Sequence, residues 1–273
     1  MCEVLGVSTS GYYYWQAELK DDCKIADLDA QIKTVFEESR ETYGSLRIVK
    51  VLQQKGVEVS ESKVARRMRA LEITPVTKKR FKSTTDSKHD MPIAANILNR
   101  SFKVSEIGRV WVSDITYIRV GDSFVYLTTV IDLADRMVIG WSLSKDMTDK
   151  NTVIMAFKRA LINRKLEVGA IFHSDRGSQY ASKAFRQLLR DNLCIQSMSR
   201  KGNCWDNAVA ESFFKTIKTE SLYRYKFTSF NQVYSTVFDY IDGWYNTMRI
   251  HSALGDKSPQ QMSLYLNAKK MAA

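Results

Sequence analysis

The 273-residue sequence has little of the chemistry that builds disulfide frameworks or zinc sites. Its four cysteines (Cys2, Cys23, Cys194 and Cys204) are scattered and form no CxxC pair, which favours reduced thiols in an intracellular protein. Only three histidines are present, and none stands at a zinc-binding spacing from a cysteine. We therefore expect neither a disulfide-rich secreted fold nor a zinc-binding domain.

Long apolar runs are also missing. No stretch reaches the roughly 18 apolar residues that indicate a transmembrane helix, and residues 1–3 lack the basic start of a signal peptide. Hydrophobic residues make up 44% and charged residues 26% of the chain, which is ordinary for a globular protein. This length and composition predict a substantial core with one small additional domain and no membrane association.

Acidic residues are outnumbered: 30 Asp and Glu residues stand against 41 Lys and Arg residues, which gives a net charge of +11. A basic surplus favours a polyanionic partner, because nucleic-acid binding releases condensed counterions. The surplus is concentrated between positions 63 and 82, where eight cations accompany one anion, Glu72. These cations are Lys63, Arg66, Arg67, Arg69, Lys78, Lys79, Arg80 and Lys82. A solvated basic face without a partner is the alternative interpretation.

The region before residue 74 has helical periodicity. Residues 27–40 form the first predicted helix, Ser45 is expected to cap a second helix, and Ser60 is expected to cap a third. The apolar positions expected to face inward in the last two helices are Leu46, Val49, Leu52, Val64, Met68 and Leu71. A turn at Gly56 predicts a helix-turn-helix-like region over residues 1–73 whose cationic face contacts DNA. A helical hairpin that only packs on the core is the alternative.

A basic, proline-containing linker is predicted over residues 74–104. Beyond it the pattern changes to strands, which are expected at residues 110–120, 124–133, 136–143, 170–172 and 195–198. Helices are expected at residues 152–163, 182–191, 207–222 and 231–246. Three antiparallel strands followed by alternating helices and strands predict a mixed α/β sheet with flanking helices.

Three carboxylates are the candidate catalytic groups. Asp114 lies in the first predicted strand, Asp175 follows an apolar strand, and Glu211 lies in a predicted helix, with 35 residues between it and Asp175. Carboxylates are hard oxygen ligands that suit Mg²⁺ or Mn²⁺. A set of three can hold two ions roughly 3.5–4 Å apart and catalyse in-line displacement at phosphorus. A structural role is the better interpretation of Asp114 or Asp175 alone, but the order and spacing of all three acids favour catalysis.

Five segments resemble those of a known family. They are residues 43–48 (YGSLRI), 111–117 (WVSDITY), 173–180 (HSDRGSQY), 206–218 (DNAVAESFFKTIK) and 245–259. In this order the chain resembles a DDE transposase of a bacterial insertion sequence, and more narrowly the downstream-frame product of the third insertion-sequence family. The resemblance implies a ribonuclease-H-like core, shared with retroviral integrases, at residues 105–225, and a helical extension at residues 226–273.

The resemblance also implies an activity, which is metal-dependent DNA cleavage and strand transfer at the terminal inverted repeats of an insertion sequence. Asp114, Asp175 and Glu211 would be the catalytic and metal-binding residues, with two Mg²⁺ ions per site and Mn²⁺ as a substitute. The expected partners are the element ends, target DNA, further copies of the chain on DNA, and an upstream-frame segment that supplies sequence-specific binding. A cytoplasmic, nucleoid-associated location in a bacterium follows.

Basic residues near the three acids are candidate DNA contacts. By resemblance Lys218 contacts the terminal DNA, and Lys215 shares its helix face, although an ion pair with Glu211 is the alternative for Lys215. Arg200 and Lys201 lie in a glycine-containing loop that can hold a DNA end. The full candidate set is Lys218, Lys215, Arg200, Lys201, Arg66, Arg67, Lys78, Lys79 and Arg80.

Four further residues have both structural and functional interpretations. His173 can contact a phosphate, orient the site or serve the fold. Trp205 can stack on a base, but core packing is favoured for a single tryptophan. Asp206 and Asn207 are expected first to cap the following helix and second to contact the substrate.

Two other functional classes stay open. One is a ribonuclease-H-like nuclease that cleaves without joining strands, against which the basic helices and the 245–259 segment argue. The other is a DNA-binding regulator without catalysis, against which the complete set of acids and Lys218 argue. Joined strands, cleaved strands alone, or binding alone would distinguish the three.

Overall fold

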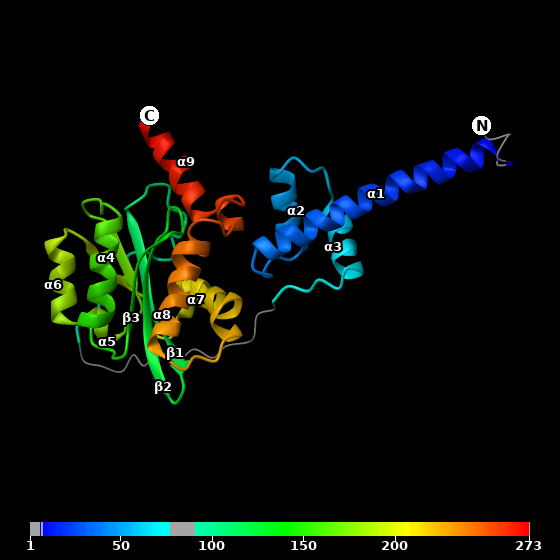
Figure 1. Cartoon of the computed structure of the whole chain (residues 1–273). Helices are drawn as coiled ribbons and strands as arrows, with labels where there is room; N and C mark the ends of the chain where they lie inside the picture. The colour runs from blue at the N-terminus through cyan, green and yellow to red at the C-terminus, as the bar shows by residue number, and fades with distance from the viewer. Residues whose placement is uncertain (1–5, 7, 77–90, 273) are drawn as a thin grey trace. The chain divides into compact units, whose positions relative to one another are not determined.

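The computed structural model describes residues 6, 8–76 and 91–272, without the side chains of residues 15–23 and 204. The chain divides into two compact units, Met1–Thr77 and Lys78–Ala273. Figure 1 shows the helical elements of the first unit and the central sheet of the second.

The described part of the first unit contains α1 (Thr9–Glu38), α2 (Ser45–Gln54) and α3 (Glu61–Ala70). Ile32, Ile48, Leu52 and Val64 are fully buried and form its small core. The helix predicted at residues 27–40 begins much earlier, at Thr9. The prediction started too late because it followed apolar periodicity, and among the described side chains of α1 the buried apolar ones, Leu28, Ile32 and Val35, lie in its last part.

The two short helices have the predicted turn between them. Gly56 adopts a left-handed φ of 83°, and the Ser60 side chain caps α3 by accepting a hydrogen bond from the Lys63 amide at 3.3 Å. The N-cap of α2, however, is Gly44, so the cap predicted at Ser45 is wrong by one residue.

Leu46 was also predicted incorrectly, since its side chain is 63% exposed. The buried face of α2 consists of Ile48, Val49 and Leu52. Residues two positions apart on a helix point in nearly opposite directions, so Leu46 points away from Ile48 and from the core.

A mixed sheet is the centre of the second unit (Figure 1). Its strands are β1 (Val110–Val120), β2 (Ser123–Asp132), β3 (Val138–Ser144), β4 (Ile171–Ser174) and β5 (Ile195–Met198). In the described residues the strand order is β3-β2-β1-β4-β5, with β1 antiparallel to β2 and parallel to β4. The predicted mixed α/β sheet is confirmed, and β1 is its central strand.

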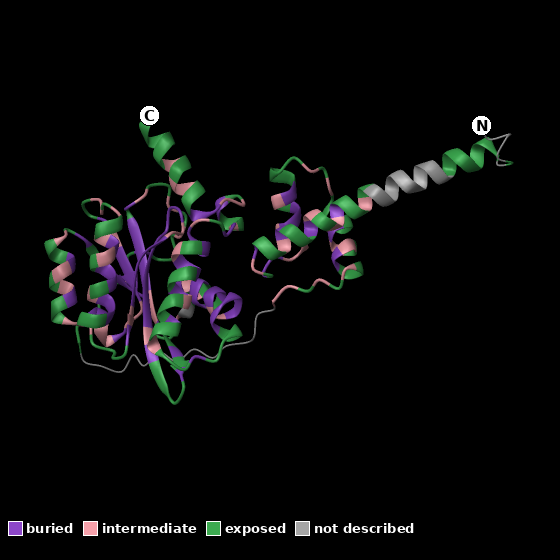
Figure 2. Ribbon diagram, viewed as in Figure 1, coloured by how far each residue is buried: buried purple, intermediate pink, exposed green. Residues whose placement is uncertain are grey.

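Helices cover both faces of this sheet (Figure 1). On one face lie α4 (Met155–Asn163), α5 (Ser178–Ala181) and α6 (Lys183–Asp191), and on the other lie α7 (Ala208–Glu220) and α8 (Phe230–Phe238). The main core fills the space between the sheet and the first set, where Trp111, Phe157, Phe172 and Phe185 are fully buried. Figure 2 shows the resulting burial along the central strands.

Irregular helical turns flank several of these helices. A π-helical segment (Lys150–Ile154) precedes α4, and another (Asp239–Tyr245) follows α8. Short 3₁₀ turns occur at Cys204–Asn207, Leu222–Arg224 and Ser252–Leu254. The final helix, α9 (Pro259–Met271), begins with a capping box between Ser258 and Gln261, a signal that is readable in the sequence.

The C-terminal segment is attached to the sheet by Asn246. Its side-chain oxygen accepts a hydrogen bond from the Val138 amide at 2.9 Å, and its side-chain nitrogen donates to the Val138 carbonyl at 2.9 Å. The amide side chain thus pairs with the backbone where β3 begins. This contact explains why the segment around Asn246 packs against the core.

Candidate active site

Asp114 lies on the sheet face opposite the main core. Successive side chains alternate between the two faces of a strand, and its neighbour Ile115 packs against the main core under α4 and α6. Asp114 is therefore directed toward the face that α7 covers. Its Oδ1 atom accepts a hydrogen bond from the Ile115 amide at 2.9 Å.

Asp175 follows β4, the parallel neighbour of β1. The register pairs Val112 with His173, so two residues further along the chain Asp114 and Asp175 are level with each other. Asp175 Oδ1 accepts a hydrogen bond from the Gly177 amide at 2.9 Å, which stabilises the sharp turn after the strand. Two adjacent strands thus bring two of the predicted acids together.

Glu211 joins the two aspartates from α7. Burial raises the pKa of Asp114 well above its usual range, and the charges of Asp175 and Glu211 raise it further. Burial also raises the pKa of Glu211, where Lys215 opposes the shift and Asp175 adds to it. The three predicted acids therefore come from three separate elements and lie within electrostatic range of one another.

The chemistry of this cluster fits a divalent cation. Partly buried carboxylates repel one another, and a positive charge among them relieves that repulsion. Within the residues that the structure describes, no three His, Cys, Asp or Glu side chains enclose a position suitable for a metal ion. The three acids therefore lie near one another without forming a closed coordination shell.

Buried hydrogen bonds support the base of the site. The hydroxyl oxygens of Tyr180 and Ser113 are 2.8 Å apart, and Asn207 Nδ2 donates to the Ser113 carbonyl at 3.1 Å. Burial raises the pKa of Tyr180 well above its usual range, and the charges of Asp114 and Asp175 raise it further. Asn207 thus connects the start of α7 to β1. Asn207 is the N-cap residue of α7, as predicted, but its side chain makes no cap hydrogen bond.

Asp206 is fully buried and, unlike Asn207, is not the N-cap residue of α7, so its predicted cap role is wrong. Its carboxylate accepts hydrogen bonds from Arg200 at 2.7 and 2.8 Å, from Arg100 at 2.8 Å and from Asn96 at 2.9 Å. The hydrogen bonds from Arg200, followed by those from Arg100, lower the pKa of Asp206. This network attaches the distant segment that contains Asn96 and Arg100 to the start of the helix that carries Glu211.

Two lysines of α7 accompany Glu211. The Nζ atom of Lys215 is 4.0 Å from Glu211 Oε2, a long ion pair between an exposed lysine and a partly buried glutamate. The Nζ atom of Lys218 lies 5.1 Å from the centroid of the Tyr117 ring. Burial lowers the pKa of Lys218, and the charge of Asp114 opposes this shift. Lys218 therefore places a positive charge close to the acids.

Known protein families match three stretches of this sequence. Integrase core domains match residues 105–204 and 194–259, and an HTH-like domain matches residues 20–81. The chain is 38% identical over 261 residues to a 31 kDa protein of insertion element IS600 from Shigella sonnei, covering 95% of this chain and 96% of that protein. It is 35% identical to the transposase InsF for insertion sequence IS3A from Escherichia coli K12, covering 96% of this chain and 92% of that relative.

The chain belongs to the IS3 family of transposases. Its fold also matches a chain of the simian T-cell lymphotropic virus intasome, with a TM-score of 0.50 and 16% identity over 78% of this chain and 73% of that one. The predicted ribonuclease-H-like core and helix-turn-helix-like region are confirmed. The protein is a polynucleotidyl transferase that acts in DNA transposition and integration by strand transfer.

The candidate DNA contacts of the transposase have different environments. Arg66 and Lys201 are exposed. Arg67, in contrast, donates from Nε and Nη2 to the two carboxylate oxygens of Asp29 at 2.7 and 2.6 Å. Arg200 is held by Asp206, although its side chain is 49% exposed. The remaining candidates of the linker, Lys78, Lys79 and Arg80, lie outside the described residues.

His173 has a structural role, which was one of the roles that the sequence left open. It is fully buried, with Nδ1 2.9 Å from the Ser197 hydroxyl and Nε2 3.2 Å from the Ser199 hydroxyl. Burial lowers its pKa to about 4, so the imidazole is neutral at physiological pH. Both ring nitrogens are engaged in joining β4 to β5 and the following loop.

The environment of Trp205 differs from the prediction. The favoured core packing is wrong, because the side chain is 69% exposed. The next two residues, Asp206 and Asn207, are buried and hydrogen-bonded within the protein. The indole is thus exposed, although the two residues that follow it are held within the protein.

A buried ion pair at the other end of α7 was not predicted. Arg249 donates to Glu220 from Nε at 2.8 Å and from Nη2 at 2.7 Å, and the Tyr240 hydroxyl donates to the same carboxylate at 2.6 Å. Both charged side chains are at most 6% exposed. Arg249 lies in a segment that resembles the family, so the sequence singled it out. Nothing in the sequence showed that its partner is Glu220, 29 residues earlier.

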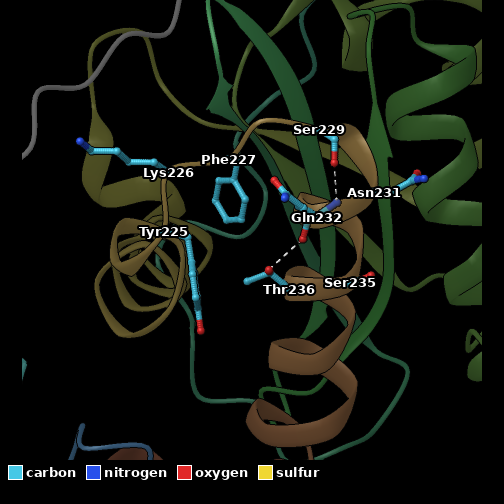
Figure 3. A pocket seen from close by; sticks show the side chains of 8 residues that line it. All are labelled: Tyr225, Lys226, Phe227, Ser229, Asn231, Gln232, Ser235 and Thr236. Atoms are coloured by element: carbon cyan, nitrogen blue, oxygen red, sulfur yellow. Dashed lines mark hydrogen bonds between the residues drawn. The ribbon is translucent and has the colours of Figure 1, made fainter.

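Figure 3 shows a separate pocket of about 520 Å³ at the start of α8. Its lining residues are Tyr225, Lys226, Phe227, Ser229, Asn231, Gln232, Ser235 and Thr236. None of the three acids lines this pocket, so it is distinct from the candidate active site.

Among the helices that the structure describes, none combines the length and the hydropathy needed to cross a membrane.

Proposed function

We propose that Asp114, Asp175 and Glu211 are the catalytic residues of this transposase and together hold two Mg²⁺ ions, with Mn²⁺ as a substitute. The observation that carries the proposal is the convergence of three carboxylates from β1, the end of β4 and α7, with mutual effects on their pKa values. When bound, the ions would stabilise negative charge at phosphorus and lower the pKa of the attacking hydroxyl.

The surrounding residues hold and orient the reacting groups. Asn207 and Tyr180 hold Ser113, and thereby β1 beside Asp114, in position. Lys218 would contact a phosphate of the terminal DNA, since its ammonium group lies close to the acids. The site would first direct water onto a phosphate at the element end and release a 3′-hydroxyl. It would then direct that hydroxyl onto a phosphate of the target.

DNA is the proposed partner of both units. The exposed cations of α3 would contact the phosphates of the terminal inverted repeats, and Lys215, Arg200 and Lys201 would line the path to the acids. The linker cations Lys78, Lys79 and Arg80 would contribute in the same way. Because two element ends must be joined, the transposase would act as a homo-oligomer on DNA, together with an upstream-frame segment that adds sequence-specific binding.

A strand-transfer assay tests the catalytic proposal. Labelled DNA with the terminal repeats of the element is incubated with the protein and Mg²⁺ or Mn²⁺, alongside Glu211→Gln and a sample with a chelator. The expected result is metal-dependent joined product that Glu211→Gln abolishes. Cleavage without joining would favour the nuclease interpretation. Joining by Glu211→Gln at the wild-type rate would exclude Glu211 from the site.

Arg66 and Arg67 are expected to differ when each is replaced by alanine. Arg66→Ala should weaken DNA binding and reduce the slope of log affinity against log salt by about 0.9, because one phosphate contact is lost. Its thermal stability should stay unchanged, since Arg66 is exposed. Arg67→Ala should lower the melting temperature, because it removes both hydrogen bonds to Asp29. Salt titrations and thermal melts of the two variants measure this contrast. Equal melting temperatures for both would contradict it.

A further inference from the structure

We propose that Trp205 stacks on an unpaired nucleobase of the DNA strand end next to the phosphate that the transposase cleaves. The inference rests on the proposed active site and deepens it by assigning a substrate contact outside the acids. Its starting point is an indole that is 69% exposed in a turn that ends at the helix carrying Glu211.

The turn around Trp205 is anchored to the protein. Directly after Trp205, the fully buried Asp206 accepts hydrogen bonds from Arg100 and Arg200, and Asn207 donates to the Ser113 carbonyl. These contacts hold the two residues that lie between Trp205 and the first residue of α7, Ala208. The ring of Trp205, directly before these held residues, is 69% exposed, which leaves its face available for a ligand.

The position of the turn relates the indole to the chemistry. Ser113, which Asn207 contacts, directly precedes Asp114 in β1. Glu211 follows Asn207 by a little more than one helical turn of α7. The turn that carries the exposed ring thus contacts the strand that holds Asp114 and leads into the helix that holds Glu211, where a DNA end must enter to react.

The charge of the same loop selects the chemical class of the ligand. Lys201 is exposed, and the side chain of Arg200 is 49% exposed even though Asp206 holds it. A cationic loop binds the phosphate backbone, and an aromatic face stacks on any base, so the combination suits a single-stranded DNA segment. Paired bases in a duplex have no free face, which restricts the contact to a base released from its partner.

The test combines variants of the protein with abasic positions in the DNA. Binding is measured for wild type, Trp205→Ala and Trp205→Phe on duplexes with the element's terminal repeat, each with one abasic nucleotide near the cleavage position. Trp205→Ala should weaken binding to intact DNA by roughly 5- to 100-fold, and Trp205→Phe should recover most of the loss. At one position, the abasic nucleotide should weaken binding by wild type but cause no further loss in Trp205→Ala.

A base analogue gives an independent readout. 2-Aminopurine is dim when stacked and bright when unstacked, so at the position where the abasic nucleotide and Trp205→Ala are not additive it should fluoresce less with saturating wild type or Trp205→Phe than with saturating Trp205→Ala. The matched control is Tyr265→Ala in α9, which removes an aromatic ring that is 52% exposed. This control should bind like wild type, and the unchanged melting temperature of Trp205→Ala should show that its fold is intact. If Trp205→Ala does not fold, wild type and Trp205→Phe still report the quenching.

Several results would overturn the inference. These are wild-type affinity in Trp205→Ala, additive effects of Trp205→Ala and the abasic nucleotide at every position, unquenched 2-aminopurine with wild type, or no binding of terminal-repeat DNA by wild type. Failure of the proposed active site looks different, because it would appear as strand transfer by Glu211→Gln. The two proposals can therefore fail separately.

Discussion

Asp114→Asn is expected to reduce strand transfer on the order of 10³-fold or more, because it removes one charged oxygen donor from the acidic cluster. The same substitution is expected to raise the melting temperature of the metal-free protein. Burial, followed by the charges of Asp175 and Glu211, raises the pKa of Asp114. A neutral amide of the same shape removes the free-energy cost of holding a buried negative charge beside two other acids.

The sign of the pH dependence follows from linkage. The pKa of Asp114 is higher in the folded than in the unfolded protein, so the folded state binds this proton more tightly. As the pH rises through the folded pKa, the charged Asp114 increasingly destabilises the fold. The stability advantage of Asp114→Asn should therefore be largest at neutral and alkaline pH and should vanish in acid.

Thermal melts across pH and product gels with Mg²⁺ measure the two effects. The matched control is Asp122→Asn in the β1–β2 turn, where the carboxylate is fully exposed and only 3.6 Å from Arg119. Asp122→Asn should change neither property. A melting temperature of Asp114→Asn that falls below wild type at neutral pH would contradict the repulsion between the acids.

Glu220→Gln is expected to lower the free energy of unfolding by about 3–5 kcal/mol, because it leaves Arg249 buried without a counter-charge. Burial alone lowers the pKa of Arg249, but its hydrogen bonds to Glu220 outweigh this and raise the pKa overall. Tyr240 would also lose a charged acceptor. Since Glu220 ends the helix that carries Glu211, strand transfer should fall as well.

Denaturant titrations measure this loss, with Glu167→Gln as the control. Glu167 pairs with Lys270 at 3.3 Å on the surface, so its replacement should cost less than about 1 kcal/mol. Replacing both Glu220 and Arg249 by methionine should recover much of the lost stability, because the unpaired charge disappears. An equal loss in Glu220→Gln and Glu167→Gln would show that the buried pair does not stabilise the protein.

Local patterns in the sequence predicted most of the secondary structure. A run of β-branched and aromatic residues predicted β1 at residues 110–120, and the strand predicted at residues 195–198 coincides with β5. Ser60 as a helix cap was equally readable, because a cap and the amide it accepts from are three residues apart. The cap of α2 was predicted at Ser45 instead of Gly44, and Leu46 was predicted to face inward. Both errors arose because neighbouring residues had similar local sequence patterns.

The candidate site was visible in the sequence for a different reason. Three acids at family-specific spacing identified its members, but their proximity depends on β1 and β4 lying side by side and on α7 covering the same face. No local pattern indicated that Asp206 binds Arg100, which is 106 residues earlier in the chain. The partner of Arg67, Asp29, was hidden in the same way, and so was the exposure of Trp205.

By itself, the sequence determined the family, the transferase chemistry, the set of acids and the order of strands and helices, because these depend on residue type, spacing and local periodicity. The tertiary structure decided which charges face a partner and which are used within the protein. Arg66 is exposed, for example, whereas Arg67 pairs with Asp29 and Arg249 pairs with Glu220. Such pairings depend on how distant segments pack, and the free energy of a charge depends on its neighbours and its burial.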